Sequence, residues 1–167
     1  MTIYDDAFEE IMRLTSAGEY AAAMQLCNQH LQDWPPSKHD EALHSLAYVQ
    51  SRAGDLTGAF VTISKAIDLA PETAGHRHAR ATWALQLKHY DAAVADAGAL
   101  LDLEKARGSI VYKNTALVIR SFGLSKLGKS ADALRDLSDV DDEGPFRLCG
   151  ANWMKSQLVE LAKSAGK

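Results

Sequence analysis

Histidine, cysteine and acidic side chains are the groups in this sequence that could support catalysis or metal binding. The six histidines are His30, His39, His44, His76, His78 and His89, and none belongs to an HExxH pair. The only local group is His76-Arg77-His78. On a helix, residues two positions apart point about 200° apart, so these two imidazoles cannot share one metal ion.

The remaining sequence offers no catalytic signature. It contains no Gly-rich phosphate loop, and no nucleophile motif marks any serine. Cys27 and Cys149 lie far apart and within helical patterns, which argues against a zinc site or a disulfide scaffold and indicates two reduced thiols. We therefore expect no enzyme activity, no catalytic residue, no cofactor and no bound metal.

An acidic run, formed by Asp136, Asp139, Asp141, Asp142 and Glu143, lies near the end of the last regular helical pattern. One interpretation is a docking patch for a basic partner. The other is a solvated turn before a C-terminal helix, where acids would interact favourably with the helix dipole. The sequence leaves both open, and with them the question of which surface is the main contact.

Composition narrows the classes of partner. A chain of 167 residues with 47% hydrophobic and 24% charged residues is expected to form a single globular domain, residues 1–167. Its net charge of −4 argues against nucleic acid, which would usually require a basic stripe. The acidic start, MTIYDDAFEE, is unlike a signal peptide, and no apolar run reaches the roughly 18 residues of a membrane span. We expect a cytoplasmic protein without a membrane partner.

The elements that must position any binding residues are pairs of short amphipathic helices. Leu43–Pro71 shows the plan, with two apolar-periodic runs separated at Gly54-Asp55 and ended by proline. An alanine on the second run recurs at spacings of 36, 34 and 40 residues, at Ala23, Ala59, Ala93 and Ala133. Gly18, Gly54 and Gly128 occupy the inner turns, and Pro35, Pro71 and Pro145 follow the second runs.

This pattern resembles the tetratricopeptide-repeat family over about residues 4–147. Tyr20 and Tyr90 match the family's aromatic site, and Ala47, Ala81 and Ser121 match its small first-helix site. The departures are bulky Ile11 at the small site, Lys88 at the third inner turn, and Lys105 followed by the insertion KARGSIVYK.

The resemblance implies an all-α fold, an α-solenoid of about four helix pairs. The pairs are expected at about residues 4–37, 40–73, 74–107 and 114–147, followed by a capping helix at about 149–165. Trp153, Met154, Leu158 and Leu161 would share the apolar face of that last helix. An amphipathic helix used for self-association is the alternative.

The resemblance also implies that the first helices line a concave groove in which ligands lie. The positions that match are Phe8, Met12, His44, Tyr48, Arg52, His78, Thr82, Gln86, Val118, Phe122 and Lys126. We expect the apolar and aromatic members to be at least partly exposed, as is typical of interaction anchors. The alternative is that some of them belong to the core.

A chain built almost entirely of such repeats is expected to act by binding one cognate protein or an extended peptide. The most specific prediction is a bacterial immunity protein that neutralises a toxin domain. Residues 134–163, LRDLSDVDDEGPFRLCGANWMKSQLVELAK, loosely resemble stand-alone repeat proteins encoded beside bacterial toxins. The alternatives are a secretion chaperone for an export substrate and a generic scaffold or adaptor.

Overall fold

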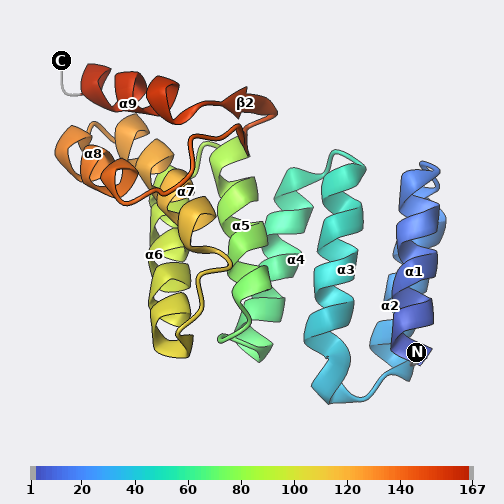
Figure 1. Ribbon diagram of the computed structural model, residues 1–167. Helices are drawn as coiled ribbons and strands as arrows, with labels where there is room; N and C mark the ends of the chain where they lie inside the picture. The colour runs from blue at the N-terminus through green and yellow to red at the C-terminus, as the bar shows by residue number, and fades with distance from the viewer. Residues whose placement is uncertain (1–2, 166–167) are drawn as a thin grey trace. The chain divides into compact units, whose positions relative to one another are not determined.

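The computed structural model describes residues 3–165, with side chains described from Asp6 onward, and within that range its regular elements are helices and one short β-hairpin (Figure 1). The all-α class predicted from the sequence is confirmed. The chain divides into two compact units, Met1–His76 (unit 1) and Arg77–Lys167 (unit 2). Helix α5 (Ala74–Gln86) begins in unit 1 and continues in unit 2.

Unit 1 contains α1 (Ile3–Ser16), α2 (Tyr20–Asp33), the 3-10 turn η1 (Pro36–Lys38), α3 (His39–Arg52) and α4 (Leu56–Leu69). Each of these α-helices packs against the next, and α1 also contacts α3. Ile11, Ala23, Cys27 and Val49 form the centre of one core cluster. Burial there raises the pKa of the Cys27 thiol to about 12, so this cysteine is an uncharged core residue.

Unit 2 continues with α6 (Tyr90–Arg107), α7 (Lys113–Lys126), α8 (Ser130–Ser138), β1 (Phe146–Leu148), β2 (Ala151–Trp153) and α9 (Lys155–Ser164). Helix α7 is central, since it packs against α6, α8, α9 and β1. The two strands pair antiparallel, with Phe146 opposite Trp153. Cys149 and Gly150 form the tight turn between them, with φ of 51° and 80°.

The alanines used to align the repeats are fully buried at Ala23, Ala59, Ala93 and Ala133. A side chain that ends at Cβ lets the first helix approach closely. In unit 2 this contact is direct, because the Ser121 hydroxyl donates to the Ala133 carbonyl at 3.1 Å. The sequence spacing therefore identifies the positions where the two helices of a pair meet.

The inner turns share one backbone conformation in both units. Gly18, Gly54, Lys88 and Gly128 have φ of 80°, 91°, 62° and 75°. In each turn, the N–H of the next residue donates to a carbonyl five residues back, at 2.8–2.9 Å, which is the Schellman helix ending. Lys88 was expected to mark a different turn. Its backbone is the same, and it holds a conformation that glycine adopts more easily.

The C-terminal segment differs from the prediction. The helix begins at Lys155 rather than at about residue 149, so Trp153 and Met154 do not belong to its apolar face. Positive φ at Cys149 and Gly150 favours the hairpin over a helix, and Met154 is extended at the helix start. Helix α9 nevertheless packs against α7 and α8, with Leu158 fully buried.

Candidate binding face

Three first-helix positions make up the predicted groove, and each recurs at the same spacing as the anchor alanines. The first repeat contributes residues to two of them and the other three repeats to all three. We call them the leading, middle and trailing positions; four residues separate successive ones, so they share one helix face. The leading position holds Phe8, His44, His78 and Val118, the middle position holds Met12, Tyr48, Thr82 and Phe122, and the trailing position holds Arg52, Gln86 and Lys126.

In unit 1, this face remains partly open on the adjacent helices α1 and α3. Phe8 is 49% exposed, whereas Met12 and Tyr48 are half-buried and Arg52 is exposed. We call these four residues the unit 1 face. The partial exposure of Phe8, Met12 and Tyr48 agrees with the sequence-based expectation, and a half-exposed aromatic side chain is typical of an interaction anchor.

A partly buried polar chain fixes the leading position of α3. His44 Nδ1 lies 2.8 Å from His76 Nδ1, and His76 Nε2 lies 3.0 Å from the Asp40 carboxylate. His76 is only 4% exposed. When its Nε2–H donates to Asp40, its Nδ1 is an acceptor for the His44 Nδ1–H. The chain therefore orients the His44 ring, and the described residues include no group of three metal-ligating side chains.

The unit 2 positions on α5 are more polar. His78 is half-buried, and its ring lies 5.3 Å from that of Tyr112. Burial lowers the pKa of His78, which keeps its imidazole neutral at neutral pH. The Thr82 hydroxyl donates to the His78 carbonyl at 2.9 Å, and Gln86 is exposed. This part of the face offers hydrogen-bonding groups rather than an apolar anchor.

The expected exposure of Val118 and Phe122 is wrong. Val118 is 1% exposed and Phe122 is 4% exposed, and strand β1 and helix α9 of the C-terminal segment both pack against α7. The Trp153 ring meets Phe122 edge to face, with centroids 5.4 Å apart and planes at 77°. Lys126, which is exposed, places its Nζ 5.3 Å from the centroid of the Phe122 ring. Here the chain's own C-terminal segment occupies the predicted face.

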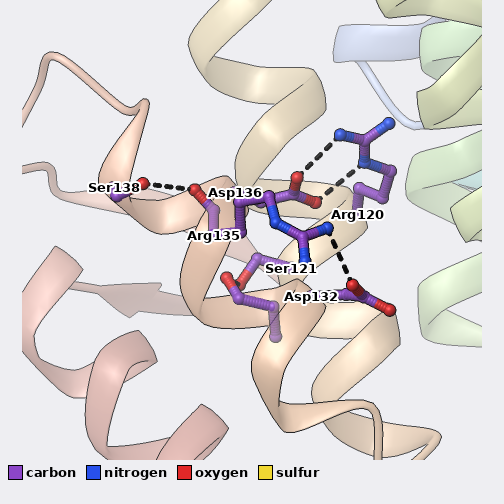
Figure 2. A network of polar contacts seen from close by, with 7 residues as sticks. Arg120, Ser121, Asp132, Arg135, Asp136 and Ser138 are labelled. Carbon is purple, nitrogen blue, oxygen red and sulfur yellow. Dashed lines mark hydrogen bonds and ion pairs between the residues drawn. The ribbon is translucent and has the colours of Figure 1, made fainter.

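Two partly buried arginine–aspartate pairs join the helix pairs of unit 2, and they were not predicted from the sequence. Arg120 donates from Nε and Nη2 to the two carboxylate oxygens of Asp136, at 2.8 and 2.7 Å (Figure 2). Arg80 and Asp96 make the same two bonds, each at 2.7 Å. The hydrogen bond to Asp136 raises the pKa of Arg120. Both pairs join a first helix to a second helix at one register.

Asp136 is the buried member of the acidic run, and three of the four exposed members have a partner within unit 2. Asp136 is buried in its ion pair, and Asp141 accepts from Lys113 Nζ at 2.8 Å, which lowers the pKa of that exposed carboxyl. Asp142 accepts from the Gly144 N–H at 3.0 Å. Glu143 lies 3.6 Å from Lys155. These local contacts favour the solvated-turn interpretation over the docking patch.

The insertion between α6 and α7 is an ordered loop. Glu104, which is 5% exposed, accepts from the Ser109 hydroxyl at 3.0 Å and from the Tyr112 N–H at 2.8 Å. The loop presents Ile110 and Val111, each 78% exposed. The insertion was visible in the sequence, but the buried carboxylate that organises it was not.

Comparison with known proteins identifies the fold. No protein-family model and no curated protein sequence matches the chain, whereas 13 solved chains match its structure. A tetratricopeptide repeat protein from Parabacteroides merdae ATCC 43184 superposes with a TM-score of 0.69 at 19% identity, covering 81% of this chain and 51% of that one. This chain thus spans about half the length of that relative.

A second neighbour is the MamA RS-1 ArsTM double mutant, with a TM-score of 0.70 at 16% identity, covering 86% of this chain and 79% of that one. Together, the two likenesses show an all-α solenoid with the tetratricopeptide-repeat fold. None of the helices within residues 3–165 has both the length and the apolarity needed to cross a bilayer.

Proposed function

We propose that this chain is a non-catalytic interaction module that binds a partner protein or an extended peptide on the unit 1 face. Folds of this type generally serve as interaction modules, which supports a protein partner. The observation that carries the proposal is the apolar surface left partly open on the adjacent helices α1 and α3. Phe8 is 49% exposed and Met12 is half-buried on α1, and Tyr48 is half-buried on α3. No nucleic acid or membrane partner is part of the proposal.

The reactive side chains support this choice because they serve the structure. Asp40 and His76 orient His44 in unit 1, and Asp136 neutralises Arg120 in unit 2. The carboxylate of Glu104 accepts the hydrogen bonds of a loop. Each group has a local partner that accounts for its position.

The sharpest form of the proposal is a cytoplasmic immunity protein, whose unit 1 face binds one toxin domain. The fold and the net charge of −4 are compatible with a basic toxin domain. An export substrate held by a secretion chaperone would also form a complex of fixed stoichiometry. A scaffold would instead bind several proteins at once.

The test is a pull-down with the purified chain, followed by identification of the bound protein and titration calorimetry with that protein purified. We expect one partner at equal stoichiometry, and we expect Phe8→Asp to weaken its binding at least about tenfold by placing a charge in an apolar contact. Val61→Asp is the matched control, because Val61 is a similarly exposed aliphatic residue of α4.

The proposal is wrong if Phe8→Asp and Val61→Asp bind the partner as tightly as the unmodified chain. Protection of cells from the captured protein would identify an immunity protein. Capture of an unfolded export substrate would identify a chaperone, and several partners bound together would identify a scaffold. Circular dichroism of both variants establishes that each has retained its helices.

A further inference from the structure

Tyr48 in unit 1 and Phe122 in unit 2 occupy the same middle position of their first helices. Each is followed four residues later by an exposed cation, Arg52 after Tyr48 and Lys126 after Phe122. Four residues bring a helical side chain back over the preceding turn, so both helices carry an aromatic ring next to a positive charge. The two units therefore share one spacing of an aromatic residue and a cation on their first helices.

In unit 2 this arrangement is occupied by Trp153. Its indole meets Phe122 edge to face at 5.4 Å, and Lys126 Nζ lies 5.3 Å from the Phe122 centroid. The indole is carried by strand β2, whose backbone is extended and paired with β1. The chain thus shows what fits such a site: an aromatic side chain presented by an extended segment.

In unit 1 the same arrangement keeps surface open to solvent. Tyr48 is half-buried where Phe122 is 4% exposed. Met12 and the 49% exposed Phe8 continue the apolar surface on α1, which packs beside α3. A partner that covered Tyr48 could therefore also cover these two side chains.

We propose that the Tyr48 site of unit 1 binds an aromatic side chain, presented by an extended segment of a partner protein, as Phe122 binds Trp153. This deepens the proposed function and rests on it. Edge-to-face packing places the positive edge of one ring on the negative face of the other, which favours an aromatic over an aliphatic ligand. Arg52 repels cations, so the residues beside that aromatic group are neutral or acidic.

A second copy of this chain is the weaker candidate for this occupant. Trp153 is the aromatic residue that the unit 2 site displays as its ligand, and each copy already uses it on its own Phe122. Exchange of the hairpin between copies would require that contact to break first. The partner is therefore a different protein with an accessible aromatic residue.

The probe is a synthetic peptide that copies residues 145–154 of this chain, PFRLCGANWM, with Cys149→Ser to prevent oxidation. A matched peptide carries Trp153→Ala as well. Each is titrated into the 15N-labelled full chain, and amide shift changes are followed. We expect the tryptophan peptide to perturb the Tyr48 and Arg52 region and to bind about tenfold more tightly than the alanine peptide.

Chain variants locate the contact. Tyr48→Ala is expected to weaken binding of the tryptophan peptide about tenfold, whereas Tyr48→Phe retains it because the ring remains. The exposed control Leu69→Ala, on α4, leaves it unchanged. The proposal is overturned by equal affinity of the two peptides, by no binding of either, or by shift changes around Phe122, which would show exchange with the chain's own hairpin.

The partner captured by the full chain separates this inference from the proposed function. If binding of the captured partner is lost in Phe8→Asp but unchanged in Tyr48→Ala, the proposed function is supported and the proposal that Tyr48 binds an aromatic side chain is wrong. If the peptide binds at Tyr48 but Phe8→Asp leaves binding of the captured partner unchanged, the proposal about Tyr48 is supported and the assignment of the partner to the unit 1 face is wrong.

Discussion

Helices α3 and α7 occupy the same place in their repeats but have different surroundings. In α3 the buried residues are confined to Ala42, Ser45, Ala47 and Val49, so the binding-face side remains partly open. In α7 they run from Ala116 to Ile119 and from Ser121 to Ser125, so the helix is buried on nearly every side. The repeat architecture alone therefore does not decide whether a first helix presents a surface for binding.

The covering segment makes the difference between the two helices. Hairpin residue Trp153 and helix α9 lie against α7 in unit 2. The sequence of α7 matches this environment, because Val118 at its leading position is apolar where α3 has the polar His44. An apolar residue at this position favours burial, whereas a polar residue there tolerates water.

The contacts between first and second helices differ as well. Unit 2 uses the pairs Arg80–Asp96 and Arg120–Asp136, and α3 and α4 have Leu46 and Thr62 at the same register. A buried ion pair is not more stabilising than a well-packed apolar pair, but losing one member is costly. The two units thus reach similar packing with different sensitivity to substitution.

The largest effect is expected in variants that replace Asp136 and Arg120 of unit 2 by threonine and leucine, the residues that unit 1 has at the equivalent positions. Asp136→Thr should lower the free energy of unfolding by about 2–3 kcal/mol, because it leaves the Arg120 guanidinium without its carboxylate. Adding Arg120→Leu should recover all but about 1 kcal/mol. Urea denaturation followed by circular dichroism measures both.

The control for this pair is Asp132→Ala. The ion pair of Asp132 with Arg135 is exposed at both ends, with side-chain exposures of 52% and 72%, so its loss should change little. A double variant less stable than Asp136→Thr would contradict the interpretation that the two kinds of contact are interchangeable.

The next largest effect is expected from removing Trp153, the hairpin residue that covers α7. Trp153→Ala should cost about 2 kcal/mol, chiefly through lost packing, since the indole Nε1 is buried without a hydrogen-bond partner in the described structure. Hydrogen exchange of the α7 amides should then accelerate toward the rates of α3. Trp34→Ala, at the end of α2, should leave α7 exchange unchanged. Unaltered exchange in Trp153→Ala would show that the hairpin does not protect α7.

A smaller effect concerns the inner turns. Lys88→Gly should stabilise unit 2 by about 1 kcal/mol, because glycine adopts a φ of 62° without the steric cost of a Cβ. Gly54→Ala should destabilise unit 1 by a similar amount. Nothing lies within 4 Å of a Cβ at Gly54, so only the backbone conformation is tested there. Thermal unfolding measures the melting temperature of both variants. Changes of the same sign would contradict the explanation from backbone conformation.

The smallest effect is a pH dependence shared by both units. Burial lowers the pKa of His78 and of His30 from an ordinary value of 6.5, so the unfolded chain binds these protons more readily. The contribution of these two histidines to stability is therefore fully present above pH 6.5 and declines as the pH falls below it. His78→Phe should flatten part of that decline in urea titrations at pH 7.5 and 5.5. An unchanged slope would show that His78 does not contribute.

Local features of the fold could be predicted from the sequence. The anchor alanines and the inner-turn glycines act within one helix pair, so their spacing along the chain is their spacing in the structure. Lys88 was misjudged because the Schellman hydrogen bonds, and not the residue type alone, fix that turn. The Arg–Asp pairs could also have been predicted. Arg80 and Arg120 are 40 residues apart, as are Asp96 and Asp136, and this is the spacing of the anchor alanines Ala93 and Ala133.

Non-local contacts could not be predicted. Trp153 covers Phe122, and the sequence around Phe122 does not indicate that a residue 31 positions later will contact it. His44 contacts His76, which lies 32 positions later in the sequence, and the helical spacing within α3 cannot predict such a contact. Residue type showed that these side chains could bind something, but not whether the chain itself supplies the ligand.

The cover over α7 also has a consequence for synthesis on the ribosome, where the chain emerges from its N-terminal end. The Ile11, Cys27 and Val49 cluster of unit 1 can form as soon as α3 has emerged. Trp153 is synthesised 31 residues after Phe122. Until it emerges from the ribosome, the apolar surface of α7 around Phe122 is uncovered. During translation, unit 2 is therefore the part of the nascent protein most in need of protection from aggregation, until the hairpin and α9 arrive.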